Sequence, residues 1–180
     1  MHHARTAITA ATIGAALLLT GCGSSGSKTS STGATTSASA SAKTAAKTDA
    51  PLTATTALAT IAGSVQSAKL TGTVTAENDP NHLLGRPNQD TSKVTFTDSR
   101  ISKSDTDGLD KDDVERGGAI EVFGNPDDAK ARAKYIQTVT KSLPMFAEYD
   151  YVLGRTVVRV SRFLTPKQAG EYKTAAAELG

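Results

Sequence analysis

A long stretch of small residues limits how much of this 180-residue chain can fold. Residues 23–50 contain only Gly, Ser, Thr, Ala, Lys and a single Asp, without one large apolar side chain. Such a segment cannot bury enough apolar surface to offset the entropy that it would lose on ordering. We therefore predict that residues 22–52 form a disordered linker and that residues 53–180 form the folded domain.

The residues before this linker have the parts of a secretory signal peptide. Arg5 makes the opening positive, and residues 6–19 are small or apolar and carry no charge. That run is shorter than the roughly 20 apolar residues that a membrane-spanning helix needs. We interpret residues 1–21 as a signal peptide that is removed on export.

The signal peptide ends in Leu19-Thr20-Gly21-Cys22, which resembles the lipobox of bacterial lipoproteins. The resemblance implies that the Cys22 thiol accepts a diacylglyceryl group and becomes the new N-terminus. Two acyl chains hold a protein stably at a membrane, whereas one chain binds reversibly. We therefore expect a lipid anchor at Cys22 on the outer face of the cell membrane. The alternative is an ordinary cleaved signal peptide followed by a chance cysteine.

Composition excludes several classes of function. Cys22 is the only cysteine, so neither a disulfide nor a thiolate site is expected. Once the signal peptide is removed, His82 is the only histidine left, which excludes a multi-histidine metal site. Residues 51–180 carry 16 basic and 17 acidic side chains, a balance that gives no electrostatic footprint for nucleic acid. We expect no cofactor, no metal and no nucleic-acid partner.

Hydrophobic patterns in residues 53–180 predict an α+β domain. We expect one small domain in which two or three helices cover an antiparallel sheet of about five strands. Glycine at position 154 favours a hairpin between the last two strands. The predicted elements are a helix at 53–68, strands at 70–76, 94–97 and 118–123, a helix from 125 to 143, strands at 148–153 and 156–163, and a helix from 165.

Two of these helices begin with capping signals. Asn125 is a preferred N-cap and stands before Pro126, which fits the first helical turn. Thr165 and Gln168 have the spacing of a capping box. The stripe that we expect the first of these helices to bury comprises Ala129, Ala133, Ile136, Val139 and Leu143. For the final helix it comprises Ala169, Tyr172, Ala176 and Leu179.

The segment 79–93 is the strongest candidate for recognition, because it is too long for a tight hairpin and mixes turn formers with polar side chains. In the functional interpretation, Leu83 and Leu84 anchor the loop to the domain. The candidate binding residues, which would face a partner or an anionic group, are His82, Arg86 and Lys93. In the structural interpretation, Arg86 satisfies loop carbonyls and Asp79 closes an Asx turn.

A second segment, residues 105–115, is rich in carboxylates. Alternating acidic residues before Gly108 are similar to a calcium-binding loop. Aligned on that glycine, however, the first ligand position is Lys103 and the twelfth is Val114, and neither can ligate calcium. A solvated acidic loop is therefore the better interpretation.

Three segments together resemble small secreted lipoproteins of actinobacteria. They are the motif Asp79-Pro80-Asn81-His82-Leu83-Leu84-Gly85-Arg86-Pro87, the strand at 117–123 and the Ala129-Lys130-Ala131-Arg132 helix. The resemblance covers residues 70–179 and implies no particular enzymatic activity. Because some phages and prophages of actinobacteria carry such lipoproteins, it points to a role in surface exclusion. This chain lacks the aromatic residue that the pattern places near Asp90.

Two hypotheses from different classes follow. The first is a non-enzymatic module of the cell envelope that binds a protein or a small ligand through residues 79–93. The second is an envelope hydrolase or transferase that uses Asp and Glu side chains. It requires a concave pocket in which at least two carboxylates converge.

Overall fold

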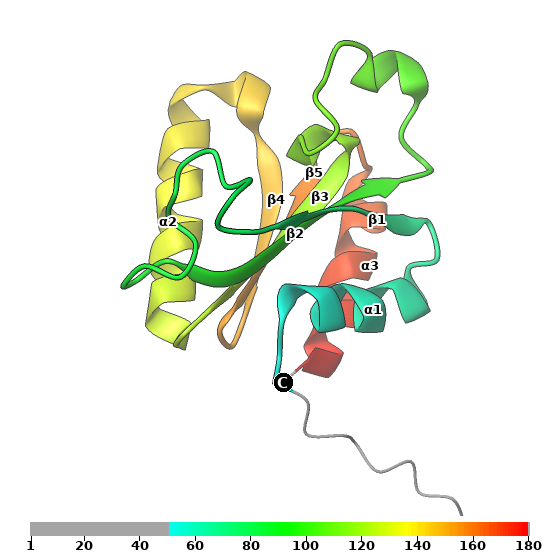
Figure 1. Ribbon diagram of the computed structural model, residues 1–180. Coiled ribbons are helices and arrows are strands. Elements are labelled where there is room, and N and C mark those ends of the chain that lie inside the picture. Colours follow the sequence, from blue (N-terminus) through cyan, green and yellow to red (C-terminus); the bar gives the residue numbers. More distant parts are fainter. Residues whose placement is uncertain (1–50, 180) are drawn as a thin grey trace, which may run out of the picture. The chain divides into compact units, whose positions relative to one another are not determined.

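The computed structural model describes residues 51–179, so the signal peptide, Cys22 and most of the predicted linker lie outside it. Helices lie on both faces of a five-stranded antiparallel sheet (Figure 1). This confirms the predicted α+β class. The helices are α1 (Ala54–Ser64), α2 (Pro126–Ser142) and α3 (Pro166–Ala176), and the strands are β1 (Ala68–Val74), β2 (Asp90–Asp98), β3 (Gly117–Phe123), β4 (Glu148–Leu153) and β5 (Thr156–Ser161). No helix in the described part of the chain is both long and apolar enough to cross a membrane.

The strands lie in the order β1-β2-β3-β5-β4, and every neighbouring pair is antiparallel. β3 is therefore the central strand, and all seven of its residues are buried. The predicted hairpin joins β4 and β5 at Gly154, whose φ of 53° is one that glycine adopts without steric cost. A central strand covered on both faces must find a partner for any charged side chain that it carries.

The larger core lies between the sheet and helices α1 and α3. Alternate residues of each strand point to this side, as expected for a pleated sheet. The strands contribute Val94 and Phe96 from β2, Ile120 and Val122 from β3, and Val158 and Val160 from β5. The rings of Phe96 and Tyr172 stack with their centroids 5.3 Å apart, which fixes α3 against β2.

The buried carboxylate of Asp98 reinforces this contact. It accepts hydrogen bonds from Tyr172 Oη at 2.6 Å and from Arg100 Nη2 at 2.7 Å. Burial alone would raise the pKa of Asp98, but the hydrogen bonds from Arg100 and Tyr172 outweigh it and lower the pKa. A charged end of β2 is thereby tied to the C-terminal helix.

Helix α2 packs on the opposite face of the sheet over a smaller core. This core consists of Phe123, Ala129, Ala133 and Val157. The buried face of α2 ends at Ile136, whereas Val139 and Leu143 are 37% and 44% exposed. The prediction that these two residues are buried was wrong, because the buried face of α2 does not extend past Ile136, and Val139 lines an open cleft instead.

The start of the folded domain is fastened to the sheet at two points. The Ala54 N–H donates to Ser92 Oγ at 2.5 Å, and Arg155 Nη2 donates to the Leu52 carbonyl at 3.4 Å. Thr53 forms a capping box with Thr56, and α1 ends at Ser64, four residues earlier than predicted. The first helix thus begins where the sequence predicts and is shorter than predicted.

Candidate functional site

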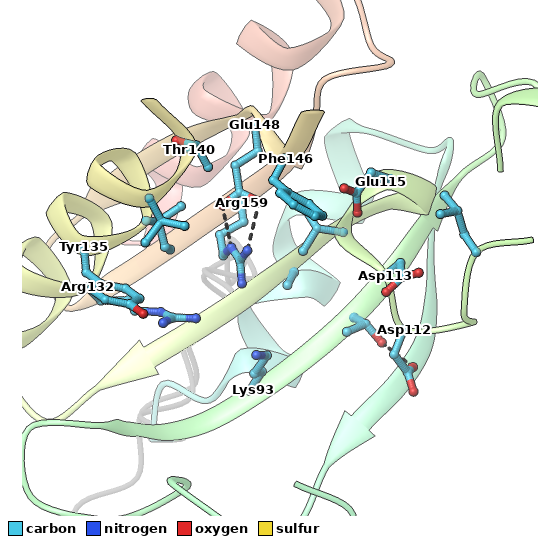
Figure 2. Close-up of a pocket in the computed structure, with 16 residues that line it drawn as sticks. Lys93, Asp112, Asp113, Glu115, Arg132, Tyr135, Thr140, Phe146, Glu148 and Arg159 are labelled. Carbon is cyan, nitrogen blue, oxygen red and sulfur yellow. Dashed lines mark hydrogen bonds and ion pairs between the residues drawn. The ribbon is translucent and has the colours of Figure 1, made fainter. Parts of the chain in front are cut away.

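A cleft of about 410 Å³ opens on the α2 side of the sheet (Figure 2). We call it the α2 cleft. Its floor is formed by Lys93 and Thr95 of β2, Ala119 of β3 and Arg159 of β5. Its two walls are Arg132, Tyr135, Ile136 and Val139 of α2 on one side and Leu109 and residues 112–115 on the other, with Phe146 at one end. Its volume lies within the usual range for sites that bind small molecules.

The charged side chains of the floor converge on Glu121, which is fully buried (0% exposed). Its carboxylate accepts from Arg132 Nε at 2.8 Å and from Arg159 Nη1 at 3.1 Å, and Lys93 Nζ lies 3.2 Å away. Burial alone would raise the pKa of Glu121. The hydrogen bond from Arg132 and the charges of Arg159 and Lys93 outweigh burial and lower the pKa to about 2.

A second carboxylate, that of Glu148, extends this arrangement to β4. Arg159 donates to it through two parallel hydrogen bonds, Nε to Oε1 at 2.7 Å and Nη2 to Oε2 at 2.9 Å. The other guanidinium nitrogen of Arg159 already contacts Glu121. Arg159 therefore has no nitrogen without a carboxylate partner and acts as a fixed bridge between the two.

Asp150 follows Glu148 on the same face of β4. Burial, and then hydrogen bonding with Glu148 and repulsion by its charge, raise the pKa of Asp150 to about 8. Asp150 Oδ1 is covered and has no hydrogen-bond partner within residues 51–179. At neutral pH this group holds a proton. We call Lys93, Arg132, Arg159, Glu121, Glu148 and Asp150 the Glu121 cluster.

Two of the three cations keep unused donors. The side chains of Lys93 and Arg132 are 25% and 28% exposed, and both line the α2 cleft. Arg132 Nη1 makes no hydrogen bond within the described residues, and Lys93 pairs only with Glu121 there. Glu121 holds both side chains in place, so little side-chain entropy remains to be lost when an anion binds.

The structure separates the three binding residues that the sequence suggests. Lys93 lies in the α2 cleft, where it pairs with Glu121. His82 and Arg86 are exposed, and neither lines that cleft. The expected anchoring of the loop by Leu83 is weak, because this residue is 37% exposed.

Asp79 provides the anchor of the loop. Its carboxylate accepts the backbone N–H groups of Asn81, Leu83 and Leu84, which includes the expected Asx turn. The guanidinium of Arg86 makes no hydrogen bond to a loop carbonyl among residues 51–179. The structural interpretation therefore holds for Asp79, but Arg86 does not have the role it proposed.

The acidic segment forms the wall that faces α2. Thr95 Oγ1 donates to Asp112 Oδ1 at 2.8 Å, which docks the segment on the sheet. Gly72 of β1 permits this approach, because a Cβ there would collide with the Asp112 carboxylate. Asp113 and Glu115 stand on the same wall (Figure 2). Within residues 51–179 no three His, Cys, Asp or Glu side chains are placed to hold a metal ion.

Several carboxylates thus meet at one concave site, as the enzymatic hypothesis requires. Glu148, Asp112, Asp113 and Glu115 all line the α2 cleft. Comparison of the sequence with known protein families and with curated proteins, and of the fold with solved structures, gives no match. The function must therefore be argued from the site itself.

Proposed function

We propose that this protein is a non-enzymatic, lipid-anchored module of the cell envelope that binds a small ligand in the α2 cleft. The observation that carries the proposal is the pair Lys93 and Arg132. Both are held by one buried carboxylate, and both present unused donors to a cleft of about 410 Å³. Preorganised donors above an open cleft are what recognition of a polar group needs.

Catalysis by carboxylates is less well supported. Glu121 and Glu148 are both occupied by arginine, so neither is free to attack a substrate or to move a proton. Two observations favour a hydrolase or transferase: the Glu115 carboxylate lines the cleft without a partner among residues 51–179, and the raised pKa of Asp150 suits a general acid. Asp150 does not line the cleft, however, and we keep the enzyme as the second candidate.

The proposed location rests on the lipobox ending in Cys22 and on the resemblance to actinobacterial lipoproteins. Replacing Cys22 by Ser removes the only thiol that can carry the lipid. We expect the wild type to sediment with membranes and to incorporate labelled palmitate, and the C22S protein to do neither, because it has no acyl chains to bury. A control protein with Ser24→Ala should behave as the wild type. Firm membrane binding of the C22S protein would contradict the anchor.

The binding function is tested with residues 22–180 carrying Cys22→Ser, which has neither the predicted signal peptide nor the acyl chains and so needs no detergent. After incubation with envelope extract, native mass spectrometry should show a small molecule retained by this protein. Lys93→Gln should reduce retention about tenfold, because a hydrogen bond to a charged group is lost. Lys134→Gln makes the same chemical change at a residue that does not line the cleft, and it is the matched control.

The same measurement distinguishes binding in the α2 cleft from binding at residues 79–93. Arg86→Gln should leave retention unchanged, because Arg86 does not line the α2 cleft. If Arg86→Gln abolishes retention and Lys93→Gln does not, the ligand binds at residues 79–93 and the cleft proposal is wrong.

A further inference from the structure

The wall of the α2 cleft changes from charged to apolar along the helix. Arg132 stands near one end, and Ile136 and Val139 follow on the same face one and two turns later. At 1.5 Å per residue, Arg132 and Val139 are about 10 Å apart along the axis. Phe146, beyond the end of α2, continues the apolar part.

This apolar part is unusually exposed. Tyr135, Val139 and Phe146 are 62%, 37% and 50% exposed, although all three line the cleft. Exposed large apolar side chains gathered beside a cleft are typical of a surface that binds an apolar group. The apolar end of the cleft is thus suited to an aliphatic chain that lies along α2.

The charged end matches a single anionic group. Lys93 and Arg132 supply donors there, both held by the buried Glu121 carboxylate and both partly exposed to the cleft. A carboxylate or a phosphodiester can bridge the two side chains.

The opposite wall limits where negative charge can lie. Asp113 and Glu115 stand across the cleft from α2 (Figure 2), and the Glu115 carboxylate makes no ion pair or hydrogen bond within residues 51–179. These carboxylates would repel a second anionic group on the ligand. The cleft therefore selects against dianions.

From this arrangement we infer that the α2 cleft binds an amphipathic monoanion, one aliphatic chain ending in a single carboxylate or phosphodiester. The inference rests on the proposed function and names the ligand class for that same site. The anionic head lies between Lys93 and Arg132, and the chain follows Ile136 and Val139 toward Phe146. A fatty acid and a lysophospholipid share this chemistry.

Titration calorimetry on residues 22–180 with Cys22→Ser tests the inference. The probes are octanoate, decanoate and dodecanoate, each below its micelle concentration. The dissociation constant should fall about two- to fourfold for each added methylene, because each one covers more of the apolar wall. Dodecane-1,12-dioate should bind at least tenfold more weakly than dodecanoate. Lysophosphatidylglycerol with a 12-carbon chain shows which source of the anionic head is preferred.

Substitutions with matched controls assign the two ends of the ligand. Lys93→Gln should weaken dodecanoate binding about tenfold, whereas Lys134→Gln should not. Tyr135→Ser and Phe146→Ser should each weaken it several-fold, and both sites are exposed enough to tolerate serine. Leu70→Ser, at a residue that is 51% exposed and lines no cleft described above, is the control. Glu115→Gln should reduce the difference in affinity between dodecanoate and dodecane-1,12-dioate.

The outcomes distinguish a wrong ligand class from a wrong site. A constant affinity along the chain-length series, or equal binding of the dioate, overturns the inference. If dodecanoate fails to bind while Lys93→Gln still abolishes retention of a molecule from envelope extract, the site is correct and the ligand class is wrong. If neither experiment responds to Lys93→Gln, the proposed function fails as well.

Discussion

Replacing Glu121 by Gln is expected to lower the free energy of unfolding by about 3–5 kcal/mol at pH 7, the range for breaking a buried ion pair from one side. Glu121 is fully buried, and three cations converge on its carboxylate. The neutral amide leaves Lys93, Arg132 and Arg159 facing one another with one carboxylate fewer. Urea unfolding followed by circular dichroism measures the loss.

The stabilising effect of Glu121 should depend on pH, because folding lowers the pKa of its carboxyl group. The pKa of Glu121 falls from 4.5 to about 2 on folding, so its contribution is fully present above pH 4.5. That contribution is lost as the pH falls toward 2, and the difference between wild type and E121Q should shrink there. Glu171→Gln, which removes a surface partner of Arg100, should cost less than about 1 kcal/mol. An equal loss in both variants would contradict a central role for Glu121.

Replacing Asp150 by Asn is expected to stabilise the protein at neutral and alkaline pH. The pKa of Asp150 rises from 3.8 to about 8 on folding, so the folded state holds a proton that the unfolded state releases. The free energy of unfolding of the wild type therefore falls as the pH rises from 4 to 8. Asparagine keeps a donor for Glu148 without this penalty.

The size of the gain is limited by solvent. Asp150 is only partly buried, and screening by water reduces the penalty, so we expect about 1–3 kcal/mol at pH 8 and no difference near pH 4. Thermal unfolding across this pH range measures both limits. Asp107→Asn, at an exposed loop position, should show neither effect. A D150N protein that is less stable than the wild type at pH 8 would show that the ionised carboxylate is needed.

Local signals in the sequence predicted the elements well. The Asn125 side chain accepts the N–H groups of Asp127 and Asp128, and Thr165 and Gln168 form the expected capping box. These features depend on residues two or three apart, so a short window of sequence contains all the partners. The strand order and the β1–β2 bulge at residues 70–72 depend on distant pairing and were not predicted.

The apolar periodicity of α2 gave a wrong prediction at the end of the helix, where the sheet no longer covers it. Val139 and Leu143 continue the apolar spacing of α2, and nothing in that spacing shows that the sheet stops covering the helix after Ile136. Of these two exposed side chains, Val139 lines the apolar part of the α2 cleft. An apolar side chain that is exposed at a position predicted to be buried thus indicates a binding surface.

The Glu121 cluster was missed for a related reason. Its six residues come from β2, β3, α2, β4 and β5, and no sequence window contains more than a few of them. One signal was present. Glu121 is the only charged residue in the strand Gly117–Phe123, and a charge in a strand buried on both faces has to be paired. Lys93 was selected from the loop 79–93, and its partner could be identified only from the fold.

The attachment of Leu52 and Ala54 to Arg155 and Ser92 has a mechanical consequence. A pull on the residues that precede the domain is carried first by these two hydrogen bonds and by α1. This helix packs on the face of the sheet that is opposite the α2 cleft. Under tension α1 should detach from the sheet before any strand separates, which would leave the proposed binding site in the α2 cleft intact.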